Sequence, residues 1–459
     1  MESGQYYLAK AHAAYEKMQP IRAKRERNKN FTYGNQWSDC TVDDNGNTTT
    51  EYAQLRERGK EPLTNNLIRQ LVKSVVGRFR NTIDTSAYPP EIADTLIDNA
   101  ADELDCRAME EFLISGCCFQ KAEITDNNGT PCVEISNVSP AKMFINAITD
   151  PRGRDCMLIG ELHDMPLAEI VHRLADGSRK KATWICETYG LTSASPETTP
   201  EWLGKSLNFY ECNEPGKLRV IEIWTQESRE YYECHNRETG EWFTIPANGA
   251  LQKEENTDYR WTLRKVWRCR WITPSGTILS QYDSPFLHGS HPYAFKLYPL
   301  TDGEVHSLVE DVIDQQKYVN RLITLVDHIM GASAKGVLLY PDTMLPEGYT
   351  WHDLRHAWSK PDSIIPYHPR TSPERPQQIS TNATNIGAYD MLNLQMKLFE
   401  QISGVSGVLQ GQSVNSATGV KLYESQIENS TVALSDIFES FNAFRRSRNA
   451  IVAKISAVK

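Results

Sequence analysis

The stretch of sequence that decides the fold is "VHSLVEDVIDQQKYVNRLITLVDHIM", residues 305–330. Its apolar residues recur every three or four positions, which is the spacing of one face of an α-helix. They are Leu308, Val309, Val312, Ile313, Val319, Leu322, Ile323, Val326, Ile329 and Met330. The opposite face carries Glu310, Asp311, Asp314, Lys317 and Asn320. We therefore predict one long amphipathic helix here.

A second helix is predicted shortly after the first. Residues 333–382, which lie between the two, are rich in proline and contain two short strand patterns, "AKGVLLY" and "DSIIPYH". Helical spacing then returns in "ATNIGAYDMLNLQMKLFEQISGV". Two helices that flank a small module predict a hairpin that projects the module.

The loop after the second helix combines glycines with amides and hydroxyls in "GVLQGQSVNSATGVKLYESQ", residues 407–426. A glycine-rich loop before a helix can cradle a phosphate. No apolar strand precedes this loop, however, and no Lys-Ser or Lys-Thr completes a nucleotide-binding motif. We therefore interpret it as a mobile loop between two helices that contacts something large. A surface loop that caps the next helix through Ser416 or Thr418 is the alternative.

The last segment, from Thr418 onward, has helical spacing with no proline. A helix of that length extends about 60 Å at 1.5 Å per residue. We expect so long a helix to contact neighbouring subunits. Its basic residues Arg445, Arg446 and Arg448 lie close together on this helix.

The first half of the chain alternates between helical and strand patterns. Helices are predicted over residues 4–30, 65–81 and 91–115, the last ending before Gly116. A hairpin, two further strands and a short helix follow. Residues 218–286 alternate as strands rich in tryptophan and tyrosine. Aromatic residues among arginines fit a site for single-stranded nucleic acid, but we favour a half-buried antiparallel sheet.

Composition bounds the classes of function. The 459 residues include 40% hydrophobic and 24% charged residues, which is typical of a globular chain with more than one core. The net charge of −10 argues against a tight reader of DNA grooves, but an acidic wall suits a channel through which DNA passes. No apolar run reaches the roughly 18 residues of a membrane span, and the N-terminus does not resemble a signal peptide.

Motifs for catalysis or metal binding are missing from the sequence. The ten cysteines form no C-x-x-C pair, so we expect reduced thiols rather than a metal site. The closely spaced histidines of "HGSH", His288 and His291, lack further ligands that we can identify. We therefore predict a protein that is not an enzyme and has no metal and no cofactor.

The order of these features resembles the portal proteins of tailed double-stranded DNA bacteriophages. The resemblance is carried by "FTYGNQW", "PLTNNLIRQLVKSVVGRFRN", "EEFLISGCCFQKAEI", "VSPAKMFINAITDPRGRDCMLIGELHDM", "SPFLHGSHPYAFKLYPLTDGEVHSLVEDVIDQQKYVNRL" and "ISGVSGVLQGQSVNSATGVKLYESQ". The fourth stretch includes a D-P…R-D element at Asp150, Pro151, Arg154 and Asp155. Each motif alone is weak, but together they cover most of the chain in the same order.

The resemblance implies an α+β portal fold. The wing would be residues 1–304, and the two stem helices would be 305–332 and 383–403. The clip, a small α/β module, would be 333–382, the tunnel loop 404–417, and a long wing helix 418–459. Portal proteins often continue into a crown, whereas this chain ends within a helix at Lys459. We therefore expect the crown to be absent or truncated.

The resemblance also implies a function and partners. Portal proteins form rings, usually of twelve subunits, around an axial channel for packaging and ejecting double-stranded DNA at one vertex of the capsid. The expected partners are the large terminase subunit, then head-tail adaptor proteins, and the major capsid protein, with no membrane. The ring would assemble in the host cytoplasm and remain in the virion.

Particular residues are assigned through the resemblance. DNA would pass the loop residues Gln410, Gln412, Ser413, Asn415 and Ser416. Lys317 and Arg321 would face the channel or pair with acidic residues of a neighbouring helix. The basic residues of the last helix, Arg445, Arg446 and Arg448, would either approach DNA or bind acidic residues of the adjacent subunit. In the clip, Trp351, Arg355, Trp358 and Lys360 would contact partner proteins, since Trp and Arg anchor interfaces, or would pack the module's core.

Overall fold

The computed structural model describes residues 4–43, 46–84, 86, 88–127, 130–190, 208–212, 214–247, 256–286, 289–333, 337–346, 348–359, 365–367, 376–379, 386–405, 432 and 434–456. The chain folds into two compact units. Unit 1 comprises Met1–Gly34, Asn66–Ile313 and Gln401–Lys459, and unit 2 comprises Asn35–Asn65 and Asp314–Glu400. Both contain helices and antiparallel strands, so the predicted α+β class is confirmed.

Two antiparallel sheets form the centre of unit 1. The larger, six-stranded sheet has the order β10-β9-β7-β6-β5, with β8 paired to β7. Its strands are β5 (Met143–Ile145), β6 (Leu158–Met165), β7 (Leu218–Asn236), β8 (Trp242–Pro246), β9 (Thr257–Ile272) and β10 (Ile278–Asp283). The smaller sheet has the order β11-β3-β4, from β3 (Cys117–Asn127), β4 (Thr130–Val138) and β11 (Tyr293–Leu297). A short hairpin follows, made of β12 (Pro299–Thr301) and β13 (Glu304–Val305).

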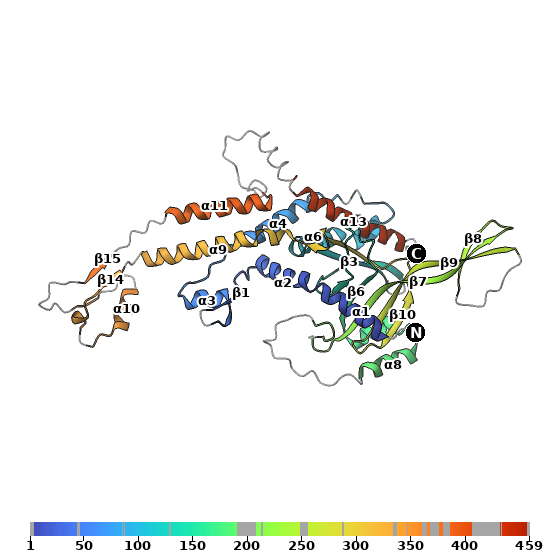
Figure 1. The fold of residues 1–459 in the computed structure, drawn as a ribbon, viewed down its shortest axis with the longest axis horizontal. Coiled ribbons are helices and arrows are strands. Elements are labelled where there is room, and N and C mark those ends of the chain that lie inside the picture. Colours follow the sequence, from blue (N-terminus) through green and yellow to red (C-terminus); the bar gives the residue numbers. More distant parts are fainter. Residues whose placement is uncertain are drawn as a thin grey trace. The chain divides into compact units, whose positions relative to one another are not determined.

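Helices cover the outer faces of both sheets (Figure 1). The helices of unit 1 are α1 (Gly4–Lys17), α2 (Gln19–Tyr33), α4 (Leu67–Arg80), α5 (Ala93–Asp98), α6 (Ala101–Ser115), α7 (Leu167–Leu174), α8 (Arg179–Gly190) and α13 (Ser435–Ser456). One core packs α1 against the larger sheet. A second core lies between the two sheets. A third packs α5, α6 and α13 against β3 and β4. These three cores bury the apolar residues of the central part of both sheets, as layered domains require.

Two predicted helices are each divided in the structure. The helix expected over residues 4–30 breaks at Met18, because Pro20 lacks a backbone N–H and lies in the first turn of α2 instead. The helix expected over 91–115 breaks at Ala100, which has a φ of 47°. At this break the side chain of Asn99 accepts from Ile135 N at 2.8 Å and donates to Val133 O at 2.9 Å. Asn99 thereby ties the start of α6 to β4.

The end of α6 is fixed by glycine, as expected. Gly116 has a φ of 71°, and its backbone N–H bonds to Phe112 O. A Cβ atom at this position would lie 2.7 Å from a side-chain carbon of Val305. Glycine is therefore required here both for the left-handed conformation and for the close approach of β13.

Unit 2 consists of the N-terminal segment 35–65 and the residues around two long helices. Its elements are β1 (Cys40–Val42), β2 (Thr48–Thr50), α3 (Glu51–Glu57), most of α9 (Leu308–Ser333), β14 (Val337–Leu339), a 3-10 turn (Asp342–Met344), α10 (Trp351–Ser359), β15 (Gln377–Ile379) and most of α11 (Ile386–Ser403). Both predicted long helices are present. The expected strand at "DSIIPYH" is wrong for its described part, since 365–367 are not extended in a sheet. Pro366 cannot donate to a ladder, and β14 pairs with β15 instead.

The C-terminal helix packs within its own chain. Its described part, α13, buries Ile437, Phe441, Phe444, Val452 and Ile455. Phe441 packs edge-on against Phe79 of α4, with ring centroids 5.0 Å apart. The expectation that this helix packs on neighbouring subunits therefore does not describe its buried face.

Candidate functional site: ion pairs and polar residues on the long helix

The predicted channel residues of α9 are ion-paired within unit 2. Lys317 Nζ lies 2.5 Å from Asp39 Oδ2 and 2.9 Å from Glu51 Oε1. Arg321 Nη2 lies 3.3 Å from the same Glu51 oxygen. Of the two interpretations of these cations, the structure shows pairing with carboxylates. The partners lie on segment 35–65 of the same chain.

The local fold places Glu51 where it can meet both cations. Thr50 caps α3 by accepting a hydrogen bond from Ala53 N at 3.2 Å. Glu51 therefore starts the helix, where a carboxylate is favoured by the unsatisfied N–H groups of the first turn. Lys317 and Arg321 are one helical turn apart on α9, so both reach this one carboxylate.

A row of buried polar side chains runs along α9 beside these ion pairs. Gln316, Asn320 and Thr324 are spaced four residues apart and are all buried. Asn320 belongs to the polar face of the predicted helix, but it is buried. Asn320 Nδ2 donates to Gln36 Oε1 at 2.6 Å, and its oxygen accepts from Asn65 N at 3.0 Å.

The row exists because an extended segment lies against it. Residues 60–66 have no regular hydrogen-bonded structure, so their backbone groups need other partners. Gln316 donates to Asn65 O at 2.6 Å, and Thr324 accepts from Leu63 N at 3.0 Å. The side chains of α9 thus hold segment 35–65 by hydrogen bonds to its backbone and to Gln36.

The remaining predicted site residues divide into two groups. The first group lies outside the described residues and consists of Gln410, Gln412, Ser413, Asn415, Ser416 and Lys360. Trp351 and Arg355 are exposed on α10, and Trp358 is half-buried. Trp351 is 52% exposed and meets Tyr340 only edge-on, at 6.4 Å between ring centroids. Its side chain is therefore available at the surface of unit 2.

Two arginines of α13 form ion pairs with Asp105 of α6, which were not predicted from the sequence. Arg448 Nη1 lies 2.9 Å from Asp105 Oδ1, and Arg445 Nε lies 2.8 Å from Asp105 Oδ2. Arg448 also donates to Gln120 Oε1 at 3.3 Å. Neither DNA nor an adjacent subunit is needed to pair these two cations, whereas Arg446 is exposed.

A second network of buried charged residues connects β3 of the smaller sheet with β6 and β7 of the larger sheet. Lys121 Nζ lies 2.8 Å from Glu222 Oε2, and His163 Nε2 lies 2.8 Å from the same oxygen. Burial alone would raise the pKa of Glu222, but Lys121 and the hydrogen bond with His163 lower it well below the usual range. Burial would lower the pKa of Lys121, but Glu222 and Glu123 raise it.

This network includes three residues with the chemistry of metal ligands. Atoms of Glu161, His163 and Glu222 lie within 4.8 Å of one another. Each is already engaged, since Tyr293 OH donates to Glu161 Oε2 at 3.1 Å and Lys121 Nζ reaches Glu222. An ammonium group beside these oxygens supplies the positive charge that a metal ion would bring, so we interpret the cluster as a buried ion network.

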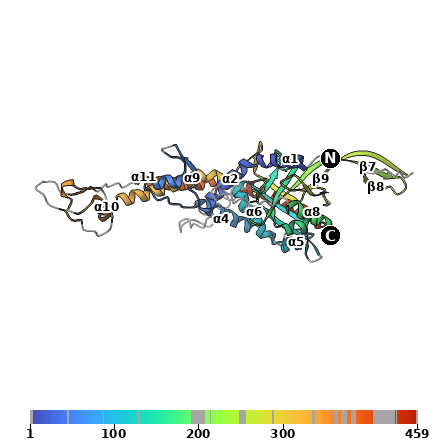
Figure 2. The same ribbon diagram turned by 90° about the horizontal axis from the view of Figure 1, so that it is seen from below.

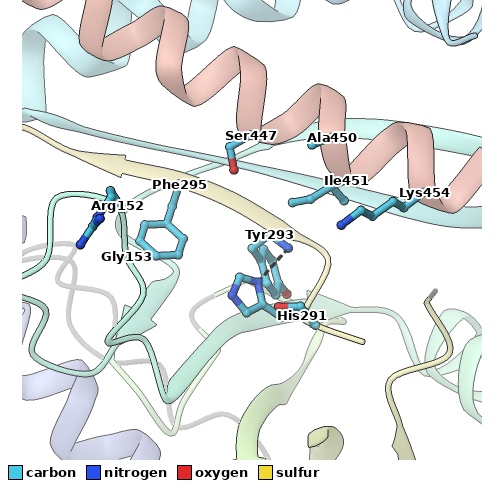
Figure 3. A pocket seen from close by; sticks show the side chains of 10 residues that line it. Arg152, Gly153, His291, Tyr293, Phe295, Ser447, Ala450, Ile451 and Lys454 are labelled. Carbon is cyan, nitrogen blue, oxygen red and sulfur yellow. Dashed lines mark hydrogen bonds between the residues drawn. The ribbon is translucent and has the colours of Figure 1, made fainter. Parts of the chain in front are cut away.

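A cavity of about 290 Å³ lies between α13 and β11 (Figure 3). His291, one histidine of the "HGSH" stretch, borders it, and His288 lies outside the described residues. His291 Nδ1 accepts a hydrogen bond from Tyr293 N at 3.3 Å. The His291 ring packs edge-on against Trp267, with ring centroids 4.7 Å apart. These contacts orient His291 as part of the core. The nearby Arg152 pairs with Asp150 at 2.9 Å.

Most aromatic residues of these strands lie on one face and the arginines on the other, although Tyr231 and Trp242 share the face of the arginines. Cross-strand pairs such as Tyr232 with Trp261 share one face of the β7–β9 sheet, whereas Glu233 pairs with Arg260 on the other. Arg264 pairs with Glu233 at 3.1 Å. A single-strand site needs bases to stack while cations follow the phosphates. This arrangement disfavours that alternative and supports the sheet interpretation.

Ion pairs and buried polar side chains stabilise each of the two units. Every described helix is also too short or too polar to cross a membrane. Residues 8–455 match the phage P22-like portal protein family, so the chain belongs to that family of portal proteins of the phage head. None of the curated proteins matches the chain.

The family membership establishes the general function of the chain. Portal proteins are structural proteins of the bacteriophage virion, located at the capsid vertex, and they act as oligomeric rings. The resemblance identified from the sequence is therefore confirmed.

Proposed function

We propose that this chain is one subunit of a portal ring whose axial channel conducts double-stranded DNA into the head during packaging and out of it during ejection. The observation that carries the proposal is the family match over residues 8–455. The net charge of −10 supports it, because an acidic protein repels phosphates and lets DNA slide. The ring has no enzymatic activity of its own and depends on a separate motor.

The parts of the ring follow the order of the chain. Residues 1–304 and the helix at 418–459 form the wing. Stem helices at 305–332 and 383–403 flank the clip at 333–382, which agrees with a small module of β14, α10 and β15 between α9 and α11. The tunnel loop is 404–417. Segment 35–65 groups with the long helices in unit 2, so we assign it to the support of the stem.

The charges on α9 suit a channel that must not hold DNA. Each firm contact between a cation and a phosphate adds affinity through counterion release, and affinity slows movement. Lys317 and Arg321 share the carboxylates of Asp39 and Glu51, which reduces their attraction for phosphate. The uncharged loop residues Gln410, Gln412, Ser413, Asn415 and Ser416 act in the same way through brief hydrogen bonds.

The clip provides the surface for partner proteins. Trp351 and Arg355 are exposed on α10, and these residue types anchor interfaces. We propose that this surface, with Trp358 and Lys360, binds the large terminase subunit during packaging in the host cytoplasm and head-tail adaptor proteins afterwards. The wing contacts the major capsid protein. The ring contains twelve subunits.

Electron microscopy of the purified chain tests the proposal. Annular particles with a central hole are expected, and native mass measurement gives the number of subunits. A second measurement follows DNA passage, since heads assembled with the protein should package DNA only when rings are present. A chain that stays monomeric at high concentration under every salt condition contradicts the proposal.

A further inference from the structure

The larger sheet of unit 1 extends into an arm that the proposed function does not use. Strand β6 pairs with β7 only as far as Thr225, and β10 pairs with β9 only from Arg268. Beyond these points β7 and β9 continue as a hairpin, joined by β8 on the other edge of β7. Figures 1 and 2 both show this part extending away from the rest of unit 1. At about 3.3 Å per residue it is roughly 30 Å long.

The arm has two faces of different chemistry. Residues that pair directly across antiparallel strands point to the same side. Tyr232 pairs with Trp261 and with Ile245, and Cys234 pairs with Tyr259 and with Phe243. The apolar face of the arm consists of Tyr232, Cys234, Phe243, Ile245, Tyr259, Trp261 and Leu263, with Glu230 and Lys265 toward its base. The opposite face carries Arg229, Tyr231, Glu233, His235, Trp242, Thr244, Pro246, Asp258, Arg260, Thr262 and Arg264.

The apolar face is open to solvent in the described part of the chain. Trp261 is 51% exposed, Leu263 55% and Phe243 40%. A sheet with one apolar face is stable only when that face is covered. The opposite face is more polar. There Arg264 pairs with Glu233, and the ring of Trp242 stacks on that of His235 with centroids 4.4 Å apart.

The size of the face indicates which kind of partner covers it. Three strands spaced about 4.8 Å apart over some seven residues present on the order of 300 Å². A stable complex between separate proteins needs roughly 800 Å² on each partner. The arm is therefore too small to hold a separate protein alone. It suits a neighbour that other contacts already hold beside it, and every subunit of a ring has such a neighbour.

We infer that the apolar face of the arm packs on the body of the next copy of this chain in the ring. This inference rests on the proposed ring. A ring is built from head-to-tail contacts, in which one surface of a subunit meets a different surface of the next. An arm that projects from one subunit provides such a contact and adds apolar burial to each interface.

The first test is the concentration at which rings assemble. In the double variant Trp261→Ser, Leu263→Ser the midpoint of assembly should rise at least tenfold in native mass spectrometry. Trp242→Ser removes an even more exposed aromatic side chain, 70% exposed, from the opposite face of the same arm. This control should assemble as the wild type does. Far-ultraviolet circular dichroism and thermal unfolding should match in all three proteins, since the removed side chains are exposed.

The second test identifies the occupant directly. A photo-cross-linking residue is introduced as Leu263→benzoylphenylalanine, with Trp242→benzoylphenylalanine as the control. Rings are assembled from a mixture of isotopically light and heavy chains. Cross-links between light and heavy chains, from position 263 to a peptide outside the arm, are the expected result, and position 242 should give few.

Three results overturn the inference. They are an unchanged assembly midpoint in the double variant, cross-links only within one chain, and cross-links in assembled heads that reach only the major capsid protein. All three leave the proposed function intact, provided that the wild type forms rings. A wild-type chain that forms no rings refutes the proposed function and, with it, this inference.

Discussion

Asp105 on α6 and Arg448 on α13 form a buried ion pair, with Oδ1 and Nη1 2.9 Å apart. The two residues are 343 positions apart in the chain, and their side chains are 0% and 1% exposed. Arg445 binds the second oxygen of the same carboxylate. The pair therefore fixes the C-terminal helix to the first half of unit 1 at one point.

Removing Asp105 should destabilise unit 1 strongly. The variant Asp105→Ala leaves the Arg448 guanidinium buried without its carboxylate, and breaking such a pair costs about 3–5 kcal/mol. We expect the urea midpoint of unfolding to fall accordingly in circular dichroism. Arg446→Ala, on the exposed face of the same helix, should change stability by less than about 0.5 kcal/mol. Similar losses in both variants contradict the importance of the pair.

The network around Glu222 predicts how the free energy of unfolding depends on pH. Its pKa in the folded chain lies well below its ordinary value of 4.5. A carboxyl with a lowered pKa stabilises the fold above the unfolded pKa and loses that contribution as the pH falls below it. Between pH 6 and pH 3 this group should cost about 2 kcal/mol of unfolding free energy.

Urea unfolding of Glu222→Gln across the same pH range checks that prediction. The variant should be less stable at pH 6, because Lys121 loses a partner, but its stability should fall less steeply with acid. Glu134→Gln, which changes an exposed carboxylate on β4, should keep the wild-type slope. Equal slopes in the wild type and Glu222→Gln would refute the assignment.

The helices and hairpins were predictable because their signals are local. Apolar spacing located α4, α9 and α11, and alternation around a turn located β3 and β4. The buried pair was not predictable from spacing, because nothing in the sequence connects α6 to α13. One signal was available, since Asp105 lies on the apolar face of α6 with Ala101, Met109 and Phe112. A carboxylate in that position requires a partner.

The polar row on α9 was missed for a similar reason. Gln316, Asn320 and Thr324 recur every four residues, but polar residues at helical spacing usually mark an exposed face. They are buried here because segment 35–65 lies against them and offers backbone groups to bind. Such a partner becomes visible only when the fold brings distant residues together.

A glycine in the larger sheet should not tolerate a side chain. A Cβ at Gly160 on β6 would lie 2.3 Å from Glu222 O and 2.2 Å from Phe144 Cζ. One of these atoms belongs to the backbone of β7 and cannot turn aside. We expect Gly160→Ala to lose about 3 kcal/mol of stability in urea unfolding.

Gly77 provides the matched control for that substitution. It lies on the exposed side of α4, with no atom within 4 Å of a Cβ built there. Gly77→Ala should therefore stabilise the chain by about 1 kcal/mol, the difference in helix propensity. A destabilising effect at Gly77, or none at Gly160, contradicts the packing described for these positions.

The ion pairs of α9 predict how charge controls the hold on DNA. In Glu51→Gln, Lys317 keeps Asp39 but loses one carboxylate, and Arg321 loses the one carboxylate with which it pairs in the described part of the chain. If these cations border the channel, rings of the variant should bind double-stranded DNA about tenfold more tightly at low salt. The gain should disappear as salt rises, because contacts with phosphate depend on counterion release. Fluorescence anisotropy across a salt series measures both effects.

Glu57→Gln makes the same charge change at the exposed end of α3 and should bind as the wild type does. Equal gains in the two variants would show that net charge, and not release of Lys317 and Arg321, is responsible.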